Sequence, residues 1–290
     1  MPLPEPLRRH YPWTPKRIPT RSGTLSVLDV GTGDPLVFVH GNPTWSFYWR
    51  TLVGPLSATH RCIAVDHLGC GLSDPQAAPA RLADHAERLV DVLDALNLAG
   101  ATLVCHDWGG PIGTLAAMAR PDLFRRLVYF NTALFHGPVP FEIRTCRWPV
   151  LGPLMVRGLN GFVRVGQRRA IAHRDRMGDG VGEGYLFPWS SWERRAAVQA
   201  FVDDIPLEAD HPTRATIDDL DARFPAFAAS RPTLLIWGMQ DFCFTPAFLD
   251  QMKVRAPHAE VAALPDAAHY VVEDAHEQIV PRLTNWLATT

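Results

Sequence analysis

The stretch V-C-H-D-W-G-G, residues 104–110, decides how this chain of 290 residues is expected to fold. The apolar run that leads into it predicts a buried strand, and the two glycines after it permit a tight turn into a helix. Asp107 stands at the apex of that turn, and the small residues Cys105 and Gly109 two positions away let it close. An aspartate here is also a favoured helix N-cap, which is the structural alternative.

Short apolar runs on both sides of this turn predict an α/β fold with a mostly parallel sheet. Residues 80–98 place leucines and valines along one helical face, as expected of a crossover helix between parallel strands. A closing helix is expected at about 273–287. Besides the run at 101–105, the predicted strands are 36–39, 61–65, 126–130, 232–238 and 261–265.

The strand pattern stops near residue 135 and returns in the last quarter of the chain. We therefore predict a core made of residues 1–134 and 227–290, with an inserted helical cap at 135–226. The cap is rich in bulky apolar side chains interrupted by Gly and Pro, which predicts short helices on irregular connections. Its G-D-G-V-G-E-G stretch at 178–184 follows no strand and lacks phosphate-loop spacing, so we predict a flexible loop there.

Composition excludes several classes of function. A formal net charge of -2 argues against a nucleic-acid partner. No apolar run approaches the ~18 residues of a membrane span, and the first residues lack the apolar core of a signal peptide. Five scattered cysteines without a C-x-x-C pair indicate reduced thiols and a cytoplasmic protein. Isolated histidines give no metal constellation, so neither a metal nor another cofactor is expected.

Asp107 is predicted to be a nucleophile, because a carboxylate with an ordinary pKa of about 3.9 is already charged at neutral pH and needs no base to attack. A carboxylate reacts poorly with ordinary esters and amides. The expected substrate therefore has an activated carbon: one that bears a halide, an epoxide or a strained lactone. Attack leaves a covalent ester of Asp107 that must then be resolved.

The loops after the last two predicted strands supply a candidate acid and base. Asp241 stands in W-G-M-Q-D-F and His269 in L-P-D-A-A-H-Y, which gives the chain order nucleophile, acid, histidine. Asp266 and Glu273 are weaker candidates for the acid, because they lie on the histidine's own loop or on the helix after it. A turn-forming aspartate and a surface histidine are the structural alternatives.

Two turns supply candidate hydrogen-bond donors for an anion. The backbone N–H groups of Asn42, after V-F-V-H-G, and of Trp108 are the predicted oxyanion donors. Their side chains add an amide N–H and an indole N–H, two neutral donors for a leaving anion. His40 and His106 flank these turns and are expected to make structural hydrogen bonds.

Four motifs, H-G-N-P-T-W-S-F-Y-W-R, H-D-W-G-G, W-G-M-Q-D-F and A-A-H-Y-V-V-E-D, resemble those of the haloalkane dehalogenases over nearly the whole chain. This resemblance implies the α/β-hydrolase fold with an inserted cap. It assigns the nucleophile to Asp107, the anion-holding pair to Asn42 and Trp108, the acid to Asp241 and the base to His269.

One large dehalogenase subfamily carries its acid as a glutamate just after the strand that matches 126–130. Here Asn131 and Thr132 follow that strand, and no carboxylate does. The sequence therefore resembles the subfamilies whose acid matches Asp241.

Within those, N-T-A-L-F-H-G-P, the cap stretch 144–162 and F-V-D-D-I-P-L are similar to the third dehalogenase subfamily, which includes the cis-β-lactone decarboxylases of long-chain olefin biosynthesis. The resemblance implies that a cis-3-alkyl-4-alkyloxetan-2-one is opened, with loss of CO2, to a long-chain cis-alkene. It also implies a complex with a β-lactone synthetase. The apolar cap suits a small apolar substrate with long alkyl chains, so we expect this activity.

Three alternatives remain open at this point. A haloalkane dehalogenase would convert a 1-haloalkane and water to a primary alcohol and halide through an alkyl ester of Asp107. An epoxide hydrolase would need cap tyrosines to protonate the opening oxide, and the cap offers only Tyr185. A non-catalytic binding protein would turn over no activated electrophile.

Overall fold

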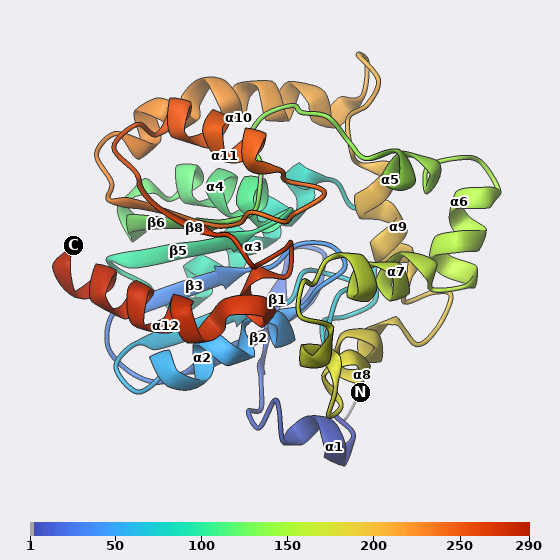
Figure 1. The fold of residues 1–290 in the computed structure, drawn as a ribbon, viewed down its shortest axis with the longest axis horizontal. Coiled ribbons are helices and arrows are strands. Elements are labelled where there is room, and N and C mark those ends of the chain that lie inside the picture. The colour runs from blue at the N-terminus through green and yellow to red at the C-terminus, as the bar shows by residue number, and fades with distance from the viewer. Residues whose placement is uncertain (1–2) are drawn as a thin grey trace.

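An eight-stranded sheet forms the centre of the computed structural model, which describes residues 3–290 (Figure 1). The strand order is β1-β2-β4-β3-β5-β6-β7-β8. Only the pairings of β2 with β1 and with β4 are antiparallel within these residues, which confirms the mostly parallel sheet. The strands are β1 (Lys16–Thr20), β2 (Gly23–Val30), β3 (Pro35–Val39), β4 (Arg61–Val65), β5 (Ala101–His106), β6 (Phe124–Phe130), β7 (Thr233–Gly238) and β8 (Glu260–Leu264).

Helices cover both faces of the sheet, which explains why its inner strands are mostly buried and apolar. Every residue of β5 is buried, because parallel strands enclosed by helices have no solvent-facing side. In Figure 1, α4, α10 and α11 lie above the sheet, and α2 and α12 lie below it. The covering helices are α2 (Arg50–Leu56), α3 (Leu82–Leu96), α4 (Gly109–Ala119), α10 (Pro212–Ala228), α11 (Pro246–Arg255) and α12 (Val271–Thr289).

Short helices between β6 and α10 gather at one end of the sheet, on the right in Figure 1. They are α5 (Phe141–Thr145), α6 (Leu151–Pro153), a π-helical turn (Leu154–Gly158), α7 (Gly161–Arg169), α8 (Val181–Leu186) and α9 (Ala196–Asp203). The short α1 (Glu5–Arg8) and several single 3₁₀ turns complete the described chain. We keep 135–226 as the proposed extent of the cap, and α10 at its end packs against α3 and α4.

The prediction of a flexible loop at 178–184 is wrong for its second half, where α8 begins at Val181. Gly184 lies in this helix because of packing: a Cβ built there would meet the ring of Phe47 at 2.3 Å. The glycine therefore permits close approach of α8 to the core, a reason that has no local signature in the sequence. No helix of residues 3–290 is long and apolar enough to span a membrane.

Candidate active site

Asp107 lies in a sharp turn between β5 and α4, at the end of a strand in the middle of the sheet. Its backbone adopts a positive φ of 53°, a conformation that is uncommon for a residue with a side chain. Two hydrogen bonds to its carbonyl oxygen hold the turn, from the N–H of Gly110 at 2.9 Å and from Oγ1 of Thr132 at 2.6 Å. A Cβ on Gly109 would lie 2.0 Å from the carbonyl oxygen of Val39, so the turn requires glycine there.

The carboxylate of Asp107 is buried and oriented by a backbone donor. Its Oδ1 accepts a hydrogen bond from the N–H of Asn42 at 2.6 Å. Burial raises the pKa of Asp107 to about 6, although the charge of His269 and backbone N–H groups of Trp108 and Asn42 act to lower it. At neutral pH the group is therefore mostly ionised, and it is poorly solvated.

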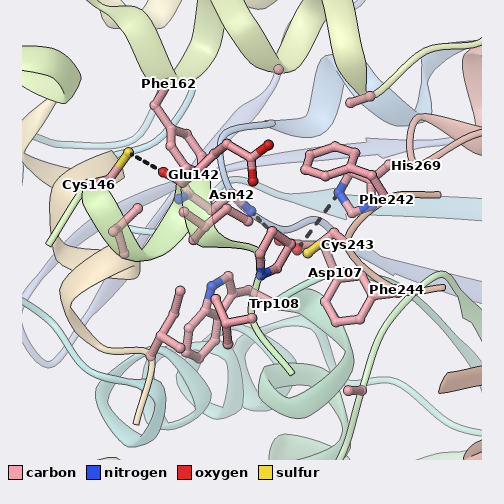
Figure 2. Close-up of a pocket in the computed structure, with 18 of the residues that line it drawn as sticks. Asn42, Asp107, Trp108, Glu142, Cys146, Phe162, Phe242, Cys243, Phe244 and His269 are labelled. Atoms are coloured by element: carbon pink, nitrogen blue, oxygen red, sulfur yellow. Dashed lines mark hydrogen bonds and ion pairs between the residues drawn. The ribbon is translucent and has the colours of Figure 1, made fainter. Parts of the chain in front are cut away.

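His269 and Asp241 lie beside this carboxylate, as the sequence predicts. Nδ1 of His269 is 2.8 Å from Oδ2 of Asp241, and Nε2 is 3.9 Å from Oδ2 of Asp107. Burial acts to lower the pKa of His269, but the charges of Asp241 and Asp107 and the hydrogen bond to Asp241 raise it overall. The ring of Phe244 stacks on the imidazole with centroids 5.7 Å apart. The imidazole is therefore fixed in place and faces Asp107 (Figure 2).

Asn131 is a site residue that the sequence analysis did not assign. It follows β6, and its Nδ2 donates to Oδ2 of Asp241 at 2.9 Å and to the carbonyl oxygen of Gly238 at 3.0 Å. Its Oδ1 accepts from the N–H of Gly238 at 2.8 Å, while the N–H of Cys243 donates to Oδ1 of Asp241 at 2.7 Å. These bonds hold the Asp241 carboxylate toward His269. In the sequence, the only indication of this role is that Asn131 directly follows the strand after which one dehalogenase subfamily carries its acid.

The two weaker candidates for the acid lie elsewhere. Glu273 forms a buried ion pair with Arg50 and accepts a hydrogen bond from the Tyr185 hydroxyl at 2.6 Å. Asp266 is exposed on the loop before the histidine. Of the carboxylates considered, Asp241 is the one hydrogen-bonded to His269.

Asn42 and Trp108 line the same cavity as Asp107 and His269 (Figure 2). The Trp108 ring packs against Phe201 of α9, with centroids 5.7 Å apart. The side-chain amide of Asn42 donates to the carbonyl oxygen of Val198, also in α9, over a long 3.3 Å. The Asn42 donor is therefore engaged with the cap, and an anion beside Asp107 would have to compete with that carbonyl group.

The cavity above Asp107 has a volume of about 660 Å³. Its walls are mostly apolar, with Met155 and Phe162 from the cap and Phe248 from the core among the lining residues. Tyr270 also lines it, and its buried hydroxyl has no hydrogen-bond partner among the described residues. Besides the groups around Asp107, the lining includes the polar residues His136, Glu142, Thr145, Arg169 and Arg214. A mostly apolar cavity with Asp107 in its wall is suited to an apolar substrate with one reactive group.

The two histidines that flank the turns of the site have structural roles. His106 is buried, and its Nε2 is 2.9 Å from the carbonyl oxygen of His269, while Nε2 of His40 accepts from the N–H of His67 at 3.1 Å. Both histidines therefore make structural hydrogen bonds. Across residues 3–290, the structure contains no group of three or more His, Cys, Asp or Glu side chains arranged to hold a metal ion.

Comparisons with known proteins show the family of this chain. The alpha/beta hydrolase fold family matches residues 34–275. A cis-3-alkyl-4-alkyloxetan-2-one decarboxylase of Shewanella oneidensis is 38% identical, covering 98% of this chain and 90% of that protein. The Xanthomonas campestris protein of the same name is 37% identical, over 96% of this chain and 97% of its own.

Haloalkane dehalogenases are also similar. Haloalkane dehalogenase 2 of Mycobacterium tuberculosis is 30% identical, with 93% of each chain covered. The crystal structure of a haloalkane dehalogenase from Bradyrhizobium elkani superposes with a TM-score of 0.86 and 26% identity, covering 95% of this chain and 98% of the other. The chain belongs to the α/β-hydrolase fold family, in the group that contains the cis-3-alkyl-4-alkyloxetan-2-one decarboxylases and the haloalkane dehalogenases.

Proposed function

We propose that this protein is a cis-3-alkyl-4-alkyloxetan-2-one decarboxylase, which converts a cis-β-lactone with two long alkyl chains to a cis-alkene and CO2. The observation that carries the proposal is the ionisable carboxylate of Asp107 at the base of a large apolar cavity. The names of the Shewanella oneidensis and Xanthomonas campestris relatives, at 38% and 37% identity, support the same substrate class.

Asp107 acts as the nucleophile in this proposal. Its Oδ1 is held by the N–H of Asn42, which leaves Oδ2 to attack the strained ring. Attack on the alkyl ring carbon breaks the bond to the ring oxygen, which leaves as a carboxylate. Loss of CO2 then supplies the electron pair of the new double bond as the ester bond to Asp107 breaks. Attack on the ring carbonyl is the alternative first step, and the overall conversion consumes no water.

The groups around Asp107 stabilise the charge that moves in these steps. The indole N–H of Trp108 and the amide of Asn42 would hold the released carboxylate, the latter after giving up its long bond to Val198. His269, oriented by Asp241, would stabilise the Asp107 carboxylate when it leaves again. Because the cavity is poorly solvated, each of these interactions is stronger than it would be in water.

Haloalkane hydrolysis is the second candidate, because the same residues would serve it. Asn42 and Trp108 would hold the halide, and His269 with Asp241 would activate water to hydrolyse the ester. The 3.9 Å between Nε2 of His269 and Oδ2 of Asp107 is suited to a base that acts on the ester. The lower identity to dehalogenases makes this the alternative.

The two other candidates receive less support. Tyr185 is buried, donates to Glu273 and is not among the cavity-lining residues. It is therefore not placed to protonate an epoxide oxygen. A non-catalytic binding protein would not need the hydrogen-bonded chain from Asn131 through Asp241 to His269.

The proposal also covers the cofactor requirement, the cellular compartment and the protein partner. Neither reaction needs a cofactor, and we expect none. The five cysteines are free thiols, as expected of a protein that works in the cytoplasm. A complex with a β-lactone synthetase is also part of the proposal. If the two proteins purify separately from cells that contain both, this part of the proposal fails.

The test is turnover of a synthetic long-chain cis-β-lactone by the purified protein. We expect one cis-alkene and one CO2 per lactone, above the rate without protein. Asp107→Asn should abolish the reaction, whereas Asp266→Asn, which changes an exposed aspartate outside the cavity lining, should not. Formation of a β-hydroxy acid in place of alkene, or full activity of Asp107→Asn, would overturn the proposal.

A further inference from the structure

The exposed apolar side chains of this protein are concentrated on the cap. Among residues 3–290, nine large hydrophobic side chains are exposed, and eight of them lie between residues 141 and 192. We call seven of these the apolar cap patch: Phe141, Trp148, Val150, Leu151, Leu154, Leu159 and Val165. Exposed apolar groups that gather on one part of a surface mark an interaction site.

The patch is continuous with the opening of the cavity. Phe141, Leu159 and Val165 are exposed and also line the cavity above Asp107. The ring of Phe141 makes an edge-to-face contact with Trp148, at 6.1 Å between centroids. The helices that carry the patch, α5 to α7, form the outer edge of the molecule on the right of Figure 1. An apolar molecule on the patch therefore lies next to the cavity, whose lining here also includes the ion pair of Glu142 with Arg169.

The segment that carries the patch has a positive net charge. Residues 141–169 contain six arginines and a single acidic residue, Glu142. Glu142 pairs with Arg169, whereas Arg144, Arg164 and Arg168 are exposed and make no ion pair within residues 3–290. Apolar and aromatic side chains bordered by arginines are the composition of elements that bind at the interface of an anionic bilayer.

We propose that the apolar cap patch docks this protein on an anionic lipid surface, from which the substrate enters the cavity. The apolar side chains insert among the acyl chains while Arg144, Arg164 and Arg168 contact the headgroups. The docking proposal rests on the proposed function in one respect. The substrate is taken to be a lactone with two long alkyl chains, which partitions into the bilayer. An acidic protein partner is the competing occupant of the patch. Flotation with vesicles alone distinguishes the two, because no other protein is present.

The experiment is flotation of the full chain with phosphatidylcholine vesicles that contain or lack phosphatidylglycerol. We expect flotation with the anionic vesicles, weakened by salt, because exposed charges are screened within about 10 Å at 0.1 M. Leu151→Asp/Leu154→Asp and Arg164→Glu/Arg168→Glu should each weaken binding by roughly tenfold or more. None of these four residues lines the cavity.

Val254→Asp is the matched control. Val254 is 72% exposed and lies on α11, outside the cap, so this substitution should leave flotation unchanged. Thermal unfolding of every variant checks that the fold is retained. A wild-type chain that stays in solution with both vesicle types overturns the proposal. Equal losses in Val254→Asp and the patch variants, or no effect of Arg164→Glu/Arg168→Glu, also overturn it.

A second measurement separates this proposal from the proposed function. Turnover of a long-chain lactone embedded in anionic vesicles should fall in the patch variants, while turnover of a short-chain, water-dispersed β-lactone should not. Equal losses on both substrates would contradict docking as the cause. A wild-type chain that floats but turns over no lactone would refute the proposed function and leave the docking proposal standing.

Discussion

The side-chain amide of Asn131 donates to Oδ2 of Asp241, the same oxygen that pairs with Nδ1 of His269. One carboxylate oxygen thus connects the loops that follow β6, β7 and β8. Since Asn131 also bonds both backbone groups of Gly238, it fixes the start of the Asp241 loop as well as the carboxylate. The orientation of His269 depends on a residue that does not touch it.

We therefore predict that Asn131→Ala destabilises the protein and slows the step that depends on His269. When a buried hydrogen bond is lost and its partner stays unpaired, the free energy of unfolding falls by about 1–3 kcal/mol. Urea denaturation would measure the loss of stability, and single-turnover kinetics would follow the chemistry. Asn131→Asp is the more severe change for the chemistry, because a second carboxylate would face Asp241. Unchanged stability in Asn131→Ala would contradict this role.

Replacing Asp107 should raise stability while it removes activity. The pKa of Asp107 is raised above that of the unfolded chain, so its proton binds more tightly in the native state. Native stability therefore falls as pH rises from about 4 through about 6. Asp107→Asn lacks this penalty, so its advantage, up to roughly 3 kcal/mol, should be present above pH 6 and lost below about pH 4. Denaturation of both proteins across this range, with Asp266→Asn as control, would reveal the effect; a variant less stable at pH 8 would contradict it.

The rate of the first chemical step should follow the ionisation of Asp107. A protonated carboxyl group is not a nucleophile, so the single-turnover rate should decrease tenfold per pH unit below about pH 6. Because the pKa of His269 is also raised, a second change is expected at higher pH, where the imidazole loses its charge. A rate that stays flat down to pH 4 would exclude Asp107 as the attacking group.

His269→Ala should separate attack from resolution. With a bromoalkane, we expect one equivalent of bromide and a stable alkyl ester of Asp107, because no base activates water. Intact-protein mass spectrometry would detect the added alkyl group, and Asp107→Asn/His269→Ala is the control that should gain none. If multiple turnovers persist in His269→Ala, another group must serve as the base.

Trp108→Phe should test the anion donor with little change in packing. Phenylalanine keeps an aromatic ring against Phe201 but removes the indole N–H that we propose holds the released anion. Loss of one such donor typically lowers kcat by about 10²–10³. The effect should appear in kcat with a normal melting temperature; an unchanged kcat would remove Trp108 from the mechanism.

The sequence predicted the central part of the fold because its signals there are local. The apolar run before Asp107 and the glycines after it specify a strand, a turn and a helix without any knowledge of distant residues. By contrast, β1 and β2 were not predicted. In β1 only Ile18 is buried, and Pro19, a residue uncommon in strands, lies within it. The apolar alternation that marks a half-buried strand is therefore nearly absent.

The polar contacts of the site were harder to predict because they join residues that lie far apart in the chain. The geometry of Asn131 depends on loops more than 100 residues apart in the chain, and nothing in F-N-T-A indicates which carboxylate the amide will bind. The bond from Asn42 to Val198 depends on how the cap packs above the sheet. The motifs predicted which residues meet, whereas their hydrogen bonds required the structure.

The most direct test of the central claim is the ratio of kcat/KM for a long-chain cis-β-lactone to that for a bromoalkane of matched chain length, measured side by side. Alkene is followed by gas chromatography and bromide in solution. We predict rapid, sustained alkene formation and slow or no sustained bromide release. Fast multiple-turnover release of bromide without alkene would contradict the account and make the protein a haloalkane dehalogenase.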